Sequence, residues 1–135
     1  MTIYVALLRA VNVGGTGKLP MADLKTLCGD ARFLRAKTYI ASGNVVFASK
    51  AAAAKVKVEL EMRLRSHAGK RIDVLLRTAA EMRAVLKANP FPKAAPNFTY
   101  ALFLNEKPPR DTLDCAFRRS RPVIPAHRDQ CDVGA

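Results

Sequence analysis

A glycine-rich polar loop is the part of this sequence whose residue types are best suited to chemistry. It follows an apolar run and precedes a segment with helical spacing, and Gly14, Gly15 and Gly17 lie within four residues. Free backbone N–H groups of such a turn, and of a helix start, can bind a phosphate or a carboxylate. The candidate residues of this anion-binding loop are Arg9, Asn12, Gly14, Gly15 and Lys18. The alternative is structural, since glycines also let a chain turn from a strand into a helix.

Gly17-Lys18 resembles the end of the phosphate-binding loop of nucleotide enzymes, but two residues which that motif requires are absent. The motif places glycine five positions before Gly17, where this chain has Asn12, and a hydroxyl residue after the lysine, where it has Leu19. The motif also belongs to parallel sheets, whereas the order of elements described below predicts an antiparallel one. We therefore exclude a magnesium–nucleotide site.

A second polar loop lies at a tight turn between two strand-like segments. Its candidate residues are Ser42, Gly43 and Asn44, of which glycine and asparagine take a positive φ at low cost. Two functions follow from the two loops. One is a binding module for an anionic, phosphate-bearing ligand or for nucleic acid. The other is an enzyme acting on a phosphorylated small molecule, with Arg9 and Lys18 neutralising charge and Asn12 or Ser42 orienting the substrate.

The remaining polar residues predict no catalytic group, metal or cofactor. Cys115, His127 and Cys131 supply only three ligands, and the chain has no Cys-x-x-Cys pair, so we expect no metal site. His67 lies on the apolar stripe of an expected helix, where packing is its expected role. Neither a Ser, His and Asp arrangement nor a pair of carboxylates stands out, so catalytic residues stay unassigned.

Net charge points to anionic partners. Lysine and arginine exceed aspartate and glutamate by 23 − 11 = +12, and residues 1–105 carry 17 basic and 6 acidic side chains. A basic folded surface favours an anionic small molecule or nucleic acid, although such charge can also serve solubility alone. The chain has neither an apolar run long enough to cross a bilayer nor a cleavable leader, so we expect a cytoplasmic protein with no membrane partner.

The periodicity of the sequence predicts an α+β fold. The expected elements are a strand at 2–9, a helix at 20–29, strands at 35–40 and 44–49, a helix within 51–67 and a strand at 71–77. The segment 51–67 alternates as a strand would, but its length and its alanine-rich composition favour a helix. This order is the ferredoxin-like βαββαβ arrangement with an antiparallel sheet.

Two subdomains are expected, the second of them incomplete. Residues 1–77 would form the ferredoxin-like subdomain. Residues 78–135 would form a partial second subdomain, with a helix at 79–88 opened by a Thr78–Glu81 capping box, a strand at 98–104 and an irregular tail with a short helix near 112–118. An unfinished sheet would leave an edge uncovered, so self-association through that edge is also expected.

RNA binding is a specific form of the nucleic-acid hypothesis. The RNA-recognition motif has the same element order and stacks bases on aromatic residues of its central strands. In this chain Tyr4 and Phe47 are the only side chains placed to do so, and the glycine-aromatic pattern of that motif is otherwise missing. Both residues are equally well explained as core residues.

Three ordered motifs resemble the bacterial family catalogued as domain of unknown function 1697. They are "YVALLRAVNVGG…KLPMADL", "TYIASGNVVF" and "LLRTAAEMRAVLKANPFP", and together they extend over residues 3–104. The resemblance implies two ferredoxin-like subdomains packed together and an uncharacterised function. Matching motif residues are Arg9, Asn12, Gly14, Gly15, Lys18, Met21, Tyr39, Ser42, Gly43, Asn44, Asn89, Pro90 and Phe91.

The chain departs from the family pattern mainly at its C-terminus. Ala10 and Ala41 are small changes from the usual glycine and glutamine. The late Gly-Arg-Ser-Lys-Leu segment and the tyrosine-bearing strand before it are missing, and "FRRSRPVIPAHRDQCDVGA" stands in their place. We therefore expect premature termination or a frameshift after about residue 115, and a non-functional truncated copy is a third hypothesis.

Overall fold

The computed structural model describes residues 1–14 and 18–115. Met1–Phe103 forms one compact unit, and the residues from Leu104 onward belong to a second. The elements of the first unit are β1 (Thr2–Leu8), α1 (Met21–Asp30), β2 (Leu34–Tyr39), β3 (Asn44–Ser49), α2 (Ala53–Ala68), β4 (Val74–Thr78), α3 (Ala79–Lys87) and a 3₁₀ turn η1 (Pro96–Phe98).

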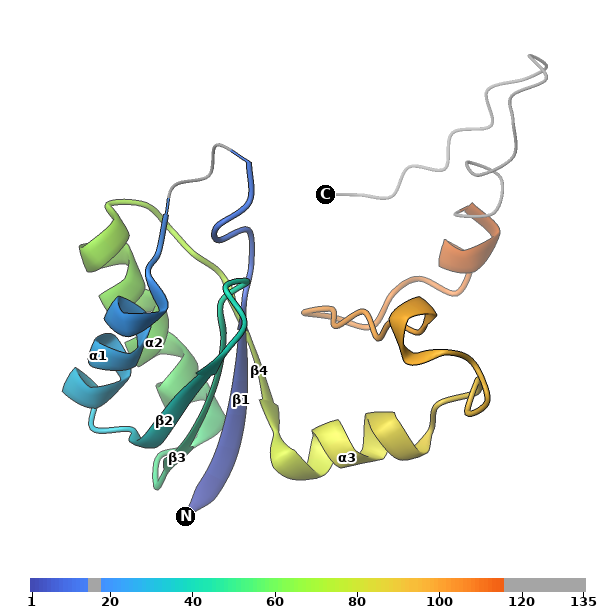
Figure 1. Cartoon of the computed structure of the whole chain (residues 1–135), viewed down its shortest axis with the longest axis horizontal. Helices are drawn as coiled ribbons and strands as arrows, with labels where there is room; N and C mark the ends of the chain where they lie inside the picture. Colours follow the sequence, from blue (N-terminus) through green and yellow to red (C-terminus); the bar gives the residue numbers. More distant parts are fainter. Residues whose placement is uncertain (15–17, 116–135) are drawn as a thin grey trace. The chain divides into compact units, whose positions relative to one another are not determined.

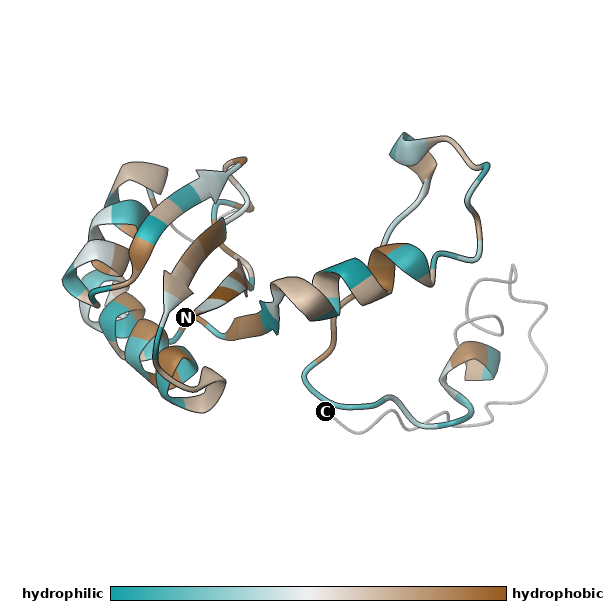
Figure 2. Ribbon diagram, turned by 90° about the horizontal axis from the view of Figure 1, so that it is seen from below, coloured by the Kyte–Doolittle hydropathy of each residue, from teal (hydrophilic) through white to brown (hydrophobic). Residues whose placement is uncertain are grey.

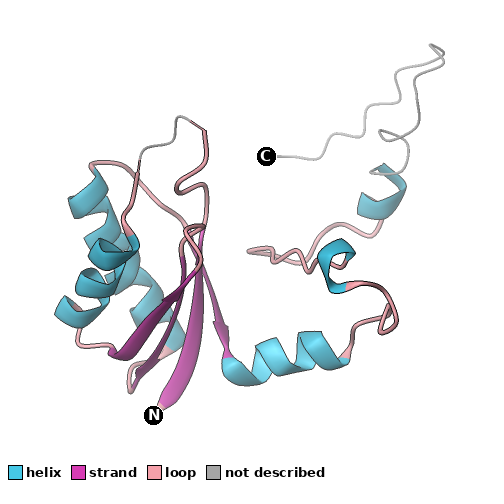
Figure 3. Ribbon diagram, viewed as in Figure 1, coloured by secondary structure: helices cyan, strands magenta, loops and turns pink. Residues whose placement is uncertain are grey.

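The four strands form one antiparallel sheet in the order β2-β3-β1-β4. Helices α1 and α2 lie side by side on one face of this sheet, and the loop that follows β1 lies at one end of it (Figures 1 and 3). Strands β1 and β2 are not neighbours in the sheet, and neither are β3 and β4. Helices α1 and α2 therefore connect these pairs across the sheet, as the βαββαβ order requires. The predicted α+β, ferredoxin-like arrangement of residues 1–77 is confirmed.

The core lies between the sheet and these two helices. Alternate residues of the central strands face it, as the two-residue period of a strand requires. Phe47 of β3 stacks on Phe33, with ring centroids 4.4 Å apart. Cys28 of α1 is fully buried, and its burial raises the pKa of its thiol to about 11, so it serves as a small apolar core residue. The most buried core residues are Ala6, Leu24, Cys28, Val45, Phe47, Val56, Leu60, Leu64 and Val74.

Residues 53–68 are helical, although their sequence alternates as a strand would. Val56, Leu60 and Leu64 lie at four-residue spacing and are fully buried against the sheet. Val58 and Met62 lie on the outer face and are 64% and 54% exposed. The apparent strand period therefore combines one buried stripe with two solvent-facing residues, and the predicted helix is confirmed.

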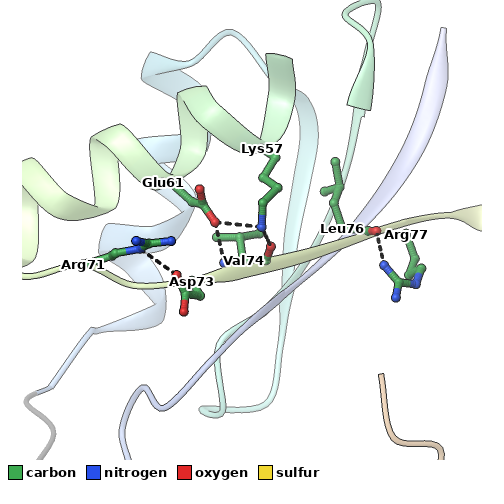
Figure 4. Close-up of polar contacts among 7 residues, drawn as sticks. All are labelled: Lys57, Glu61, Arg71, Asp73, Val74, Leu76 and Arg77. Carbon is green, nitrogen blue, oxygen red and sulfur yellow. Dashed lines mark hydrogen bonds and ion pairs between the residues drawn. The ribbon is translucent and has the colours of Figure 1, made fainter. Parts of the chain in front are cut away.

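The free edge of β4 is blocked by side chains of α2 (Figure 4). Successive strand residues direct their backbone groups to opposite sides, and Asp73 O already accepts from Arg9 N on the β1 side at 3.0 Å. Val74 therefore directs its backbone N–H and C=O groups to the free side of β4. There, Val74 N donates to Glu61 Oε1 at 3.0 Å, and Val74 O accepts from Lys57 Nζ, which is paired with Glu61 at 2.9 Å.

The opposite edge is disrupted in a different way. The register of β2 against β3 shifts between Leu34 and Lys37, and Arg35 between them has a φ of +56°. Bulges and charged residues at an edge discourage pairing with another chain. Both edges thus disfavour self-association through the sheet. The self-association expected from the sequence stays a prediction.

The helix α3 begins with the predicted capping box, but the strand predicted at 98–104 is absent. Thr78 Oγ1 accepts from Glu81 N and Glu81 Oε2 accepts from Thr78 N, at 3.2 and 2.6 Å. Figure 2 shows hydrophobic and hydrophilic bands alternating along α3. Residues 96–98 form the 3₁₀ turn, and no described strand pairs with residues 99–104. The strand prediction was wrong because apolar alternation forms a strand only where a neighbouring strand supplies hydrogen bonds.

The second unit contributes little regular structure among its described residues. Residues 112–115 are helical, as predicted for the start of 112–118, and residues 116–118 lie outside the described part of the chain. The sheet ends at Thr78, one residue beyond the predicted subdomain boundary between 77 and 78. That boundary stays a prediction, as does the division into 1–77 and 78–135.

Candidate functional site

Asn12 joins the loop after β1 to the turn between β2 and β3. Its Nδ2 donates to Leu19 O at 2.8 Å and to Ala41 O at 2.6 Å, and its Oδ1 accepts from Leu19 N at 2.7 Å. Both of its N–H donors and its carbonyl oxygen are therefore engaged. Asn12 has a φ of +55°, which asparagine tolerates better than most residues. The side chain therefore fixes the shape of the two loops, and its predicted role toward a ligand stays a prediction.

Gly43 brings the turn against the end of β1. Its O accepts from Leu8 N at 3.0 Å. Its φ is +84°, and a Cβ at this position would stand 2.3 Å from Val11 Cγ2. Only glycine fits this backbone conformation and this close approach. Both predicted loops thus meet at one end of the sheet.

An open hollow of about 790 Å³ lies where the two loops and the start of α1 meet. We call it the loop hollow. Its lining residues are Asn12, Val13, Gly14, Lys18, Leu19, Pro20, Met21 and Ala41. Lys18 is its one charged residue among those described, and its side chain makes no hydrogen bond or ion pair with the described residues. A free cation on the wall of a hollow can bind an anion.

The predicted site residues take different positions relative to the loop hollow. Asn12, Gly14 and Lys18 line the loop hollow, whereas Arg9 is exposed outside its lining. Gly15 lies outside the described residues. In the second loop, Gly43 is buried beneath the turn.

The other two residues of the second loop contact each other. Asn44 Nδ2 donates to Ser42 Oγ at 2.9 Å, and neither residue lines the loop hollow. Their prediction as ligand-binding residues is untested by this geometry. The turn itself contributes to the hollow through Ala41.

The start of α1 offers backbone donors beside the hollow. Pro20 occupies the N-cap position, and no side chain caps the first turn. Uncapped N–H groups at a helix start attract negative charge. Asp23 in the same turn is paired with His67 of α2 at 3.2 Å. The side chain of His67 is 39% exposed and so partly covered, and it contacts α1 through this polar pair.

The two aromatic residues considered for base stacking are core residues. Tyr4 and Phe47 are 4% and 1% exposed, and Tyr4 Oη donates to Ala51 O at 2.9 Å. Both rings face the layer of helices. Base stacking needs an exposed ring face, so the RNA-recognition interpretation is wrong for these two residues.

The described part of the chain shows neither a metal-ligand cluster nor a membrane-spanning helix. Residues 1–14 and 18–115 contain no group of three His, Cys, Asp or Glu side chains arranged to hold a metal ion. The Cys115, His127 and Cys131 set falls partly outside these residues. No helix in this part of the chain is both long and apolar enough to span a bilayer.

Sequence reasoning missed the apolar side of the loop hollow. Val13, Leu19, Pro20 and Ala41 make up half of its lining residues, and no polar or charged pattern marks them. Leu19 is buried and its backbone is held by Asn12. The Pro20 helix start was the only local signal at this position. The contribution of Ala41 depends on a contact across 29 positions of sequence.

Comparison with known proteins identifies the family. Residues 1–129 match the family described as "Protein of unknown function (DUF1697)", and the chain belongs to this family. It is similar to the solved structure of the conserved bacterial protein SP0830 from Streptococcus pneumoniae, with 30% identity and a TM-score of 0.60. The similarity covers 66% of this chain and 49% of that one, so the chain spans about half of that protein's length. No curated protein matches.

Proposed function

We propose that this member of the DUF1697 family is a binding module for a small anionic, phosphate-bearing ligand at the loop hollow. The observation that carries the proposal is the free Lys18 ammonium on the wall of a hollow whose two loops are held together by Asn12. A site held in shape before binding loses less entropy on association. The uncapped start of α1 adds backbone donors beside the same hollow.

Binding is better supported here than catalysis. Among the described residues of the lining, Lys18 is the one ionisable side chain, and neither a carboxylate nor an imidazole is placed for proton transfer. Arg9 is exposed on the adjoining part of the loop, where it can add charge without contacting the hollow. The enzyme hypothesis would need an acid or base from elsewhere.

Inorganic phosphate tests the proposal directly. A ligand at 100 times its Kd raises the free energy of unfolding by about 2.7 kcal/mol, so phosphate should raise the melting temperature in a saturable way. Lys18→Gln should weaken this effect several-fold. Lys25→Gln is the matched control, because Lys25 is an exposed lysine of α1 outside the hollow. Equal phosphate affinities of the two variants would overturn the proposal.

Nucleic acid is the competing partner, and salt separates it from a small ligand. A single-stranded nucleic acid whose phosphates contact several basic residues should lose affinity steeply with salt, with a log–log slope of about −0.7 for each phosphate neutralised. Tight RNA binding with such a slope, unaffected by Lys18→Gln, would assign the basic surface to nucleic acid and leave the loop hollow without a role. A broad, non-cooperative melt would instead favour the truncated-copy hypothesis.

A further inference from the structure

We infer that the loop hollow takes an anion that carries an apolar or aromatic group, in preference to a bare phosphate or a nucleic-acid backbone. The inference rests on the proposed function, because it assigns a ligand class to the same site. The inference distinguishes a bare phosphate from an anion with an apolar group, two ligands that the net charge of the protein alone would attract equally.

The composition of the lining supports this ligand class. Five of the eight lining residues have apolar side chains, namely Val13, Leu19, Pro20, Met21 and Ala41. Lys18 is the single cation. Val13 is 53% exposed, so part of this apolar wall is open to water in the unliganded protein. An anionic group beside Lys18 would satisfy the charge, and only an attached apolar group would cover the wall.

The size of the hollow points the same way. Its volume of about 790 Å³ lies within the range of small-molecule pockets, which is about 300–1,000 Å³. A bare phosphate would occupy a small part of it and leave the apolar wall in water. Binding removes apolar surface of both the ligand and the wall from water. Each ~55 Å² of this combined surface should lower the Kd about tenfold.

A second cavity carries more positive charge and provides a comparison within the same chain. It has a volume of about 300 Å³, and Arg32, Lys50 and Lys55 contribute three cations to its lining. Its one carboxylate, that of Glu59, is paired with Arg63 at 2.7 Å. Six of its eleven lining residues are apolar, so it differs from the loop hollow chiefly in carrying three cations in place of one.

Amide NMR of the full chain, titrated with a series of probes, tests the inference. The probes are inorganic phosphate, phenyl phosphate, 1-naphthyl phosphate and the neutral 2-naphthol. Affinity measured at the amides of residues 12–14, 18–19 and 41 should rise at least tenfold from inorganic phosphate to 1-naphthyl phosphate. Lys18→Gln should lower the affinity for 1-naphthyl phosphate, and Lys50→Gln should leave it unchanged. Val13→Ser should lower the affinity for 1-naphthyl phosphate and leave the affinity for inorganic phosphate unchanged.

Each outcome has a distinct meaning. Equal affinity for the three phosphates at the loop hollow would overturn the inference and leave the proposed function standing. Equal affinity for 2-naphthol and 1-naphthyl phosphate would show that charge is not recognised and would overturn the proposed function. Shifts confined to the amides around Arg32, Lys50 and Lys55 would place the ligand in the other cavity and overturn both, as would no shift with any probe.

Discussion

Gly43→Ala tests whether the two loops are packed together as closely as the structure places them. Gly43 lies in the turn between β2 and β3, with a φ of +84° and its backbone against Val11 and Leu8. Both neighbours are buried core residues. If the turn is held in this position, an added methyl group has no free volume to occupy.

Two costs add in this variant. Alanine at a positive φ is less stable than glycine by about 1 kcal/mol. Its Cβ would also stand 2.3 Å from Val11 Cγ2 and 3.0 Å from Leu8 Cβ, where carbon atoms normally stay ~3.5–4.0 Å apart. Relief requires a shift of the backbone or of buried side chains, which typically costs about 1–3 kcal/mol. We expect the free energy of unfolding to fall by about 2–4 kcal/mol in total.

Urea unfolding followed by circular dichroism measures this loss, with Gly69→Ala as the matched control. Gly69 also has a positive φ, of +67°, but a Cβ there would meet no atom within 4 Å. Its alanine variant should lose only about 1 kcal/mol. Adding Val11→Ala to Gly43→Ala should recover part of the loss, since it removes the overlapping methyl group. Equal losses in the two glycine variants, or strict additivity of the double variant, would refute the close packing.

Three further predictions concern the loops, the β4 edge and α3. Asn12→Ala should lower the free energy of unfolding by about 2–4 kcal/mol in thermal melts; Asn12→Gly should lose about 1 kcal/mol less, because it loses the same three hydrogen bonds without the cost of a positive φ. Glu61→Ala should increase concentration-dependent light scattering, since it leaves Val74 N unpaired at the β4 edge, whereas Glu59→Ala on the same helix should not. The backbone N–H of Thr78 lowers the pKa of Glu81 below its ordinary value of 4.5; the added stability is therefore present above about pH 4.5 and lost as pH falls through the folded value, so Glu81→Gln should be less stable than the native chain at pH 7 and equal to it once Glu81 is protonated.

Local sequence patterns predicted most of the fold because most of its elements have local causes. The Thr78–Glu81 capping box, the glycine turn and the buried stripe of α2 each lie within a few residues of the structure they determine. The strand predicted at 98–104 failed for the opposite reason. Its apolar alternation was genuine, but a strand also needs a partner, and whether one is present is a property of the whole sheet.

The candidate site was predictable from the sequence only as two separate loops. Polar and glycine residues identified both loops, and the structure brings the loops together. The structural role of Asn12 was not predicted because its partner carbonyl, that of Ala41, is 29 positions away in the chain. The same separation hid the apolar wall, since an alanine in a hairpin turn gives no local sign that it will line a ligand-sized hollow.

The backbone strain of this chain is concentrated around the same two loops. Four of the seven described residues with a positive φ lie in them, namely Ala10, Asn12, Ile40 and Gly43. A β-branched residue such as Ile40 is especially costly in this conformation. The hydrogen bonds of Asn12 compensate for its own strain, but neither Ala10 nor Ile40 has such a compensation. Backbone strain of this kind clusters at ligand-binding and active sites, so the strain at Ile40, next to Ala41 of the lining, agrees with the ligand site proposed at the loop hollow.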